Sequence, residues 1–192
     1  MRVFFVLVVT VAVPVGSWAD DPKKPDYYPL KKGSKWEYEV TMTDGKKHDE
    51  SVEVADVELK DGKIIATVKK SSPGVIGTYV YSADETTILE LKWNDIKHEP
   101  PIPRLKFPLK KGENWSLKKD DVELTWVVGE HVEVTVPAGK FNAIPITYTE
   151  AVGTLRVKNT LHYADGVGFI RREGVFFLGT VTQELKKFTP GK

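Results

Sequence analysis

Apolar and polar residues alternate along most of this chain, and that alternation restricts the fold more than any other feature of the sequence. In SKWEYEVTM, residues 34–42, every second residue from Trp36 to Met42 is apolar and the residues between are polar or charged. The segments 121–129, 132–136 and 155–163 show the same pattern, with Asn159 interrupting the last one. A period of two puts successive side chains on opposite faces of a strand, so we expect antiparallel sheet with one buried face.

Short turn signals separate the alternating segments. They are Asp44-Gly45, Asp61-Gly62, Pro73-Gly74, Gly129-Glu130, Pro137-Ala138-Gly139 and Asp165-Gly166. Asp-Gly between such segments is typical of hairpins because both residues tolerate a positive φ. No segment of helical length has apolar residues at i, i+3 and i+4. The sequence predicts an all-β protein of roughly ten to thirteen strands. The four prolines in residues 99–108 predict an extended connector there.

One nine-residue pattern occurs twice, as YPLKKGSKW at 28–36 and as FPLKKGENW at 107–115. Its two prolines, Pro29 and Pro108, are 79 positions apart. We interpret the repeat as a duplication that gives two related halves, 28–104 and 105–192; the alternative is convergent use of a good strand start. Each half is mostly strand, and as a separate sheet it would leave a costly exposed edge. We therefore expect both halves in one curved antiparallel sheet, an open half-barrel.

The N-terminal 19 residues have the features of a secretory signal. Arg2 precedes an apolar run from Val3 to Val15, and small residues stand before a predicted cleavage site after Ala19. The alternative is a retained anchor, but 13 residues are fewer than the ~20 that span a bilayer. We therefore expect a signal peptide at 1–19, a polar leader at 20–27 and a single β domain at 28–192. The mature chain would be soluble, without an integral membrane segment, and periplasmic or extracellular.

Charge and cysteine content exclude several classes of function. Removal of Arg2 leaves 27 Lys and Arg against 27 Asp and Glu, which argues against nucleic acid as a partner. The chain has no cysteine, so thiol catalysis, thiolate metal sites and lipid attachment to a cysteine are excluded. An exported chain without disulfides must be held together by its core alone.

No motif in the sequence predicts catalysis, and we expect no catalytic residue, metal site or cofactor. The four histidines, His48, His98, His131 and His162, lack the local spacing of a metal site. We expect His48 and His98 in solvent and His162 facing outward. The carboxylate pairs Asp49-Glu50, Asp84-Glu85 and Asp120-Asp121 are expected in turns or on wet faces. No serine lies in a Gly-x-Ser-x-Gly turn.

Aromatic residues are the best candidates for a binding surface. Core packing is their ordinary role. The alternative is a concave aromatic face that is only partly covered, with Trp36, Tyr38, Trp115 and Trp126 as lining residues. The lysine pairs Lys31-Lys32 and Lys110-Lys111 would then either rim a mouth or form solvated turns.

Three motifs together resemble an uncharacterised group of secreted bacterial β-proteins. They are aromatic-Pro-Leu-x-x-Gly-x-x-Trp at 28–36, Val-Pro-Ala-Gly-x-Phe at 136–141, and Tyr-Ala-x-Gly-Val-Gly at 163–168. Asp165 stands where the group usually has proline, and it still allows a turn. The group is distantly similar to the half-barrel carriers that sort lipoproteins. The resemblance implies a β fold and an envelope location, and it implies no reaction.

These observations lead to three functional hypotheses. The first is a non-enzymatic envelope protein that binds an apolar small molecule or a partner protein on its concave aromatic face. The second is a structural or interaction module with a fully packed core and no small-molecule ligand. The third, a hydrolase, lacks any motif in its support.

Overall fold

The computed structural model describes residues 25–176 and 179–192, and that part of the chain forms thirteen β-strands and no helix. The strands are β1 (Lys35–Met42), β2 (Lys47–Lys60), β3 (Lys63–Ser72), β4 (Val75–Ala83), β5 (Thr87–Trp93), β6 (Ile96–Lys106), β7 (Asn114–Lys119), β8 (Val122–Val128), β9 (Val132–Val136), β10 (Gly139–Val152), β11 (Leu155–Ala164), β12 (Gly168–Phe176) and β13 (Gly179–Thr189). The predicted all-β class is confirmed. Because these residues contain no helix, none of them forms a helix that could cross a membrane.

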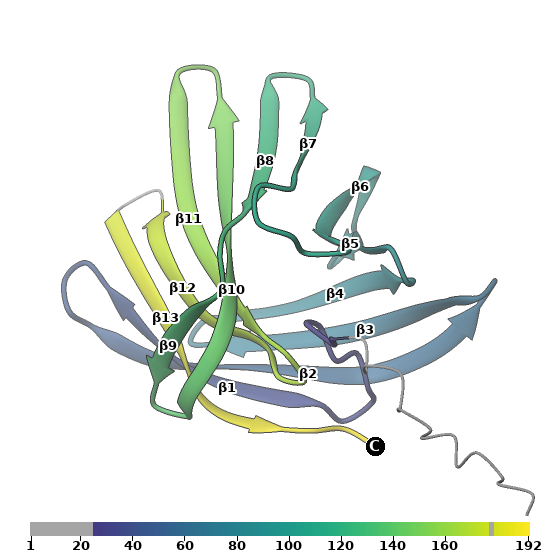
Figure 1. Cartoon of the computed structure of the whole chain (residues 1–192), viewed down its shortest axis with the longest axis horizontal. Helices are drawn as coiled ribbons and strands as arrows, with labels where there is room; N and C mark the ends of the chain where they lie inside the picture. The colour runs from purple at the N-terminus through teal and green to yellow at the C-terminus, as the bar shows by residue number, and fades with distance from the viewer. Residues whose placement is uncertain (1–24, 177–178) are drawn as a thin grey trace, which may run out of the picture.

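All the strands belong to one antiparallel sheet that curves into a nearly closed barrel (Figure 1). Strands β1 to β6 pair in chain order and form one half of the sheet. Strands β13, β12, β11, β10, β8 and β7 follow in that order and form the other half, while β9 pairs with the first part of β10. Pairing of β1 with β13 joins the halves. The predicted curved sheet is therefore confirmed.

The sheet order ends at β6 and β7, which face each other across a seam. The Trp115 indole on β7 donates a hydrogen bond of 2.9 Å to the carbonyl oxygen of Pro103 on β6. The prediction of a connector at 99–108 was wrong in part, because residues up to Lys106 belong to β6. Prolines are tolerated there because an edge strand needs backbone donors on only one side.

The two copies of the repeat form the same turn before β1 and before β7. Gly33 and Gly112 have φ angles of 84° and 86°. Each glycine N–H donates over 2.9 Å to a carbonyl on the next strand, to Val54 in the first half and to Val128 in the second. The turns thus place Trp36 and Trp115 at matching positions near the start of their strands. Descent of the halves from one ancestor stays a prediction.

We predict that Gly112→Ala lowers the free energy of unfolding by about 1 kcal/mol, because an L-residue resists a positive φ. Space is not the cause, since a Cβ at Gly112 would meet nothing within 4 Å. Urea titration of the variant measures the effect. Gly33→Ala should cost the same, and Ser116→Ala, an exposed change nearby, should cost nothing measurable. Equal stability of Gly112→Ala and the parent protein would contradict this account.

Three hydrogen bonds fix the ends of the described chain to the barrel. Tyr27 is buried, its hydroxyl lies 3.2 Å from Nε2 of His131, and the Asp26 amide donates to the Asp165 carboxylate over 2.7 Å. At the other end, the Gly191 amide donates to the Ser34 hydroxyl over 3.0 Å. The predicted signal peptide and all of the predicted leader before Pro25 lie outside the described residues.

Candidate functional site

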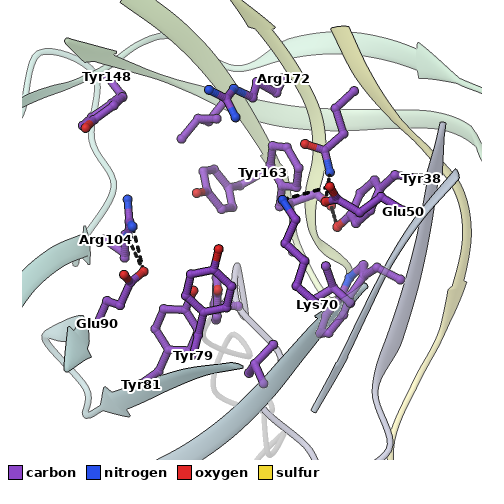
Figure 2. Close-up of a pocket in the computed structure, with 18 of the residues that line it drawn as sticks. Tyr38, Glu50, Lys70, Tyr79, Tyr81, Glu90, Arg104, Tyr148, Tyr163 and Arg172 are labelled. Carbon is purple, nitrogen blue, oxygen red and sulfur yellow. Dashed lines mark hydrogen bonds and ion pairs between the residues drawn. The ribbon is translucent and has the colours of Figure 1, made fainter. Parts of the chain in front are cut away.

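A cavity of about 250 Å³ lies inside the barrel and is lined by side chains from both halves of the sheet. Aromatic and ionisable side chains dominate its wall, as Figure 2 shows. The tyrosines are Tyr28, Tyr38, Tyr79, Tyr81, Tyr148 and Tyr163. The ionisable residues, apart from tyrosine, are Glu50, Lys70, Glu90, Arg104 and Arg172. The concave face expected from the sequence is therefore the inside of the barrel, and it is much more polar than expected.

Polar and apolar residues follow a fixed order along the inner face. On β2, Glu50 precedes Val52, and on β3, Lys70 follows Val68. Residues two apart in a strand share a face, so each charged side chain continues an inward apolar row. In both strands the charged residue lies nearer the end with the β1–β2 and β3–β4 turns. On β5 and β13 the polar lining residue also lies nearer that end than its apolar neighbour does. The polar part of the cavity therefore lies toward the end of the barrel with the β1–β2 and β3–β4 turns.

Glu90 is the most buried of the cavity's charged groups, at 2 % exposure. One of its carboxylate oxygens accepts from Arg104, with Nε at 2.8 Å and Nη2 at 2.7 Å. The other oxygen lies 2.9 Å from Nε2 of His98. Burial is the largest single influence on the pKa of Arg104 and lowers it, but the charge and hydrogen bonds of Glu90, with the added effects of Tyr81 and Tyr148, together hold the pKa above its ordinary value. Arg104 therefore remains a cation inside the barrel.

A β-bulge gives Arg104 its position. Ile88 on β5 pairs with Leu105, and the next residue, Leu89, pairs with Pro103. Arg104 is the extra residue between these two pairs, so strict alternation does not set its direction. Bulges commonly redirect a side chain beside a functional site. Here the bulge lets Arg104 line the cavity although its neighbour Leu105 is fully buried in the core.

Glu50 forms the second buried ionic group. Its two carboxylate oxygens accept from Gln183 over 2.7 Å and pair with the Lys70 ammonium over 2.8 Å. These three residues come from β2, β3 and β13, so the group joins strands on both sides of the β1–β13 junction. The side chain of Glu50 is 7 % exposed and that of Lys70 is 29 % exposed, so the lysine is the more accessible partner.

Arg172 enters the cavity from β12. Its Nε donates to Oδ1 of Asn159 over 2.9 Å, and the Asn159 amide donates to the carbonyl of Val175 over 3.3 Å. Burial lowers the pKa of Arg172; the Glu50 carboxylate opposes this effect, and the Arg104 charge adds to it. Two guanidinium groups from opposite halves of the sheet thus share one interior.

The cavity tyrosines are neutral hydrogen-bond donors at physiological pH. Burial raises the pKa of Tyr28 to about 12, and it raises the pKa of Tyr81 and Tyr163 as well. Within the described chain, the hydroxyls of Tyr79 and Tyr163 make no hydrogen bond, and Figure 2 shows both pointing toward the central space. These two hydroxyls are available to a bound molecule.

Three of the four predicted lining residues border the cavity. Trp36 and Tyr38 hold their polar ends on backbone carbonyls, with the Trp36 indole donating to Val167 over 2.6 Å and the Tyr38 hydroxyl donating to Phe169 over 3.0 Å. Trp126 also borders the cavity and is 1 % exposed. Trp115 stacks on Trp126 with ring centroids 5.9 Å apart and lies behind it at the seam. A role in ligand binding stays a prediction for all four.

Two expectations about charged residues were wrong. Glu50 and His98 were expected in solvent, but Glu50 is buried and His98 lies beside Glu90 with a side chain that is 18 % exposed. The inward residues Val52 and Val54 could have indicated Glu50 by extension of their period. His162 lies between the inward Leu161 and Tyr163 and so points away from the cavity as expected, yet it is buried.

The repeated lysine turns do not border the cavity. Lys32 pairs with Asp56 and Lys111 pairs with Glu130 in exposed ion pairs of 2.8 and 2.7 Å. Both turns precede the first residues of their strands, at the opposite end from the β1–β2 turn. These positions favour solvated turns over a charged mouth. Among the described residues, no group of three or more His, Cys, Asp or Glu side chains could hold a metal ion.

Comparison with known proteins identifies the fold alone. No protein-family model matches the chain, and no curated protein matches it. A solved structure of a candidate lipoprotein from Parabacteroides distasonis is similar with a TM-score of 0.58 and 12% identity, covering 88% of this chain and 100% of that chain. A candidate exported protein with a YmcC-like fold from Bacteroides fragilis gives 0.58 and 13%, covering 86% of this chain and 100% of that chain.

Proposed function

We propose that this protein is an exported, non-enzymatic envelope protein that holds a small molecule inside its barrel. The observation that supports this proposal most strongly is the cavity itself, because its wall contains buried charged pairs in addition to residues of the apolar core. Burying charges is costly even when they are paired, and apolar replacements of similar volume are often as stable. The presence of Glu90 and Arg104 in the interior therefore favours a binding role over a purely structural one.

Export is supported by the signal-like N-terminal sequence and by the fold. The two similar solved structures are described as a candidate lipoprotein and a candidate exported protein, both from bacteria. This chain has no cysteine for lipid attachment, so we propose that it acts in the periplasm or outside the cell without a lipid anchor. The fold carries no reaction with it.

The position of the site favours a small molecule over a partner protein. The aromatic face lies within the barrel, and Trp36, Tyr38 and Trp126 are each at most 6 % exposed. A folded partner could not contact these side chains without opening the sheet. A volume of about 250 Å³ is close to the lower end of ligand sites, which range over ~300–1,000 Å³.

Mass spectrometry tests this proposal directly. The full chain is expressed in a bacterial host that exports it, and the mature product is purified without detergent. Native and denaturing spectra are then compared, and any released compound is extracted. We expect a bound molecule that appears only under native conditions and is lost when Trp126→Ala opens the cavity wall. A ligand-free mass, together with no uptake of an added fluorescent apolar probe, would contradict the proposal and favour a purely structural module.

A further inference from the structure

Cations outnumber carboxylates on the cavity wall. Lys70, Arg104 and Arg172 face two carboxylates, those of Glu50 and Glu90. The three cations come from β3, β6 and β12, so the charge is assembled from both halves of the sheet. One further carboxylate, Glu150, accepts from the Tyr148 hydroxyl over 3.1 Å and is not itself a lining residue. The lining residues alone therefore carry one excess positive charge.

The carboxylates of the cavity are already paired, whereas N–H donors remain. Each carboxylate oxygen of Glu50 and Glu90 has a partner from the chain. An ammonium has three N–H donors and a guanidinium has five. Lys70 pairs with Glu50 alone, and Arg104 directs Nε and Nη2 to one oxygen of Glu90. The Tyr79 and Tyr163 hydroxyls can donate or accept, so the remaining N–H groups of Lys70 and Arg104 decide the balance, and they favour a molecule with acceptor atoms.

The two arginines also favour an anion between them. Both belong to the same cavity wall; burial lowers the pKa of Arg172 most, the Glu50 carboxylate raises it, and the Arg104 charge lowers it. Like charges that share a poorly solvated space repel each other. An anion placed between the guanidinium groups would remove this repulsion and form charge-assisted hydrogen bonds, which are about twice as strong as neutral ones.

We propose that the molecule held in the barrel is a small organic anion. Its carboxylate, sulfonate or phosphate group lies among Lys70, Arg104 and Arg172, and its apolar body packs on Trp126, Val68 and Leu161. This inference rests on the proposed function and goes beyond it in naming the chemical class of the ligand. A wholly apolar ligand would leave the cavity's donors without partners, at a cost in free energy.

Matched probes with one body and different head groups test the proposal. Octanoate, 1-octanol and octylammonium are titrated into the mature protein, and binding is followed by calorimetry and by tryptophan fluorescence. We expect octanoate to bind at least ~10-fold more tightly than 1-octanol, with octylammonium the weakest. Equal binding of octanoate and 1-octanol, or tighter binding of octylammonium, would overturn the anion inference and leave the proposed small-molecule function standing.

Two variants locate the head group. Arg172→Gln removes the charge, and its amide can still donate to Asn159; we expect a ~10-fold loss for octanoate and no change for 1-octanol. Tyr79→Phe should weaken the affinity for octanoate a few-fold, and it tests the inference even if Arg172→Gln fails to fold. Arg156→Gln, at an exposed arginine on β11, is the control and should change nothing. Unchanged octanoate binding in both cavity variants would overturn the inference. Failure of all three probes to bind would also overturn the inference. If the native mass also contained no ligand, the proposed function would be contradicted as well.

Discussion

Replacement of Glu90 by glutamine is expected to lower the free energy of unfolding by about 3 kcal/mol, because Arg104 would lose its counter-charge inside the barrel. Removing one partner of a buried ion pair costs about 3–5 kcal/mol. We expect the lower end of that range because the Arg104 side chain is 32 % exposed and water can reach part of it. Chemical denaturation monitored by tryptophan fluorescence measures the change.

A double variant separates the lost pair from lost packing. Glu90→Leu with Arg104→Met replaces both charges by apolar side chains and should recover most of the stability, since it leaves no unpaired charge. Glu130→Gln is the matched surface control, because the Glu130–Lys111 pair is exposed on both sides and should contribute nothing measurable. A double variant as unstable as Glu90→Gln would mean that the volume of these side chains matters more than their charges.

Trp126→Ala is expected to cost about 4 kcal/mol, the largest effect of any single substitution we predict. The Trp126 ring is 1 % exposed and lies between Trp115, at 5.9 Å, and Tyr148, at 5.3 Å between ring centroids. Its loss would enlarge the cavity next to the seam, where no strand ladder can close the gap. Thermal and urea unfolding of the purified variant measure the loss.

Trp93→Ala is the matched control for this prediction. Trp93 is 42 % exposed near the β5–β6 turn, so its truncation removes far less buried area and should cost about 1 kcal/mol. Similar losses in the two variants would show that the barrel relaxes around Trp126 instead of keeping an enlarged cavity. In that case the cavity wall would be much more deformable than the stacked rings suggest.

The strands could be predicted from the sequence because one face of the sheet is mostly apolar and the other mostly polar. In β1 the buried side chains Trp36, Tyr38 and Val40 alternate with half-exposed neighbours, as the pattern required. Pairing between distant segments left no such signal. Nothing near Trp115 indicates that its indole contacts Pro103 across a seam, because that contact depends on how far the sheet curves.

The alternation that predicts the strands also assigns charged residues to the outer face, so the charged groups of the site could not be predicted from it. In TILELKW the leucines suggest an inward face, yet Ile88 and Glu90 are the buried residues of β5. A carboxylate on an inner face is acceptable only because β6 supplies Arg104 through a bulge, and a single strand's sequence does not reveal its neighbour. Trp36, Tyr38 and Trp126 could be predicted to face inward because each occupies an apolar position of a clearly alternating segment.

Pairing of β1 with β13 has a kinetic consequence. Most ladders join strands that are close in sequence, whereas this one brings together residues about 150 positions apart. Contacts of such long range slow folding, since the entropy of a long loop is lost before the contacts form. We therefore expect the two halves of the sheet to assemble first and the β1–β13 ladder to form last. The Glu50–Gln183 contact spans this junction, so ligand binding would report the final step of folding.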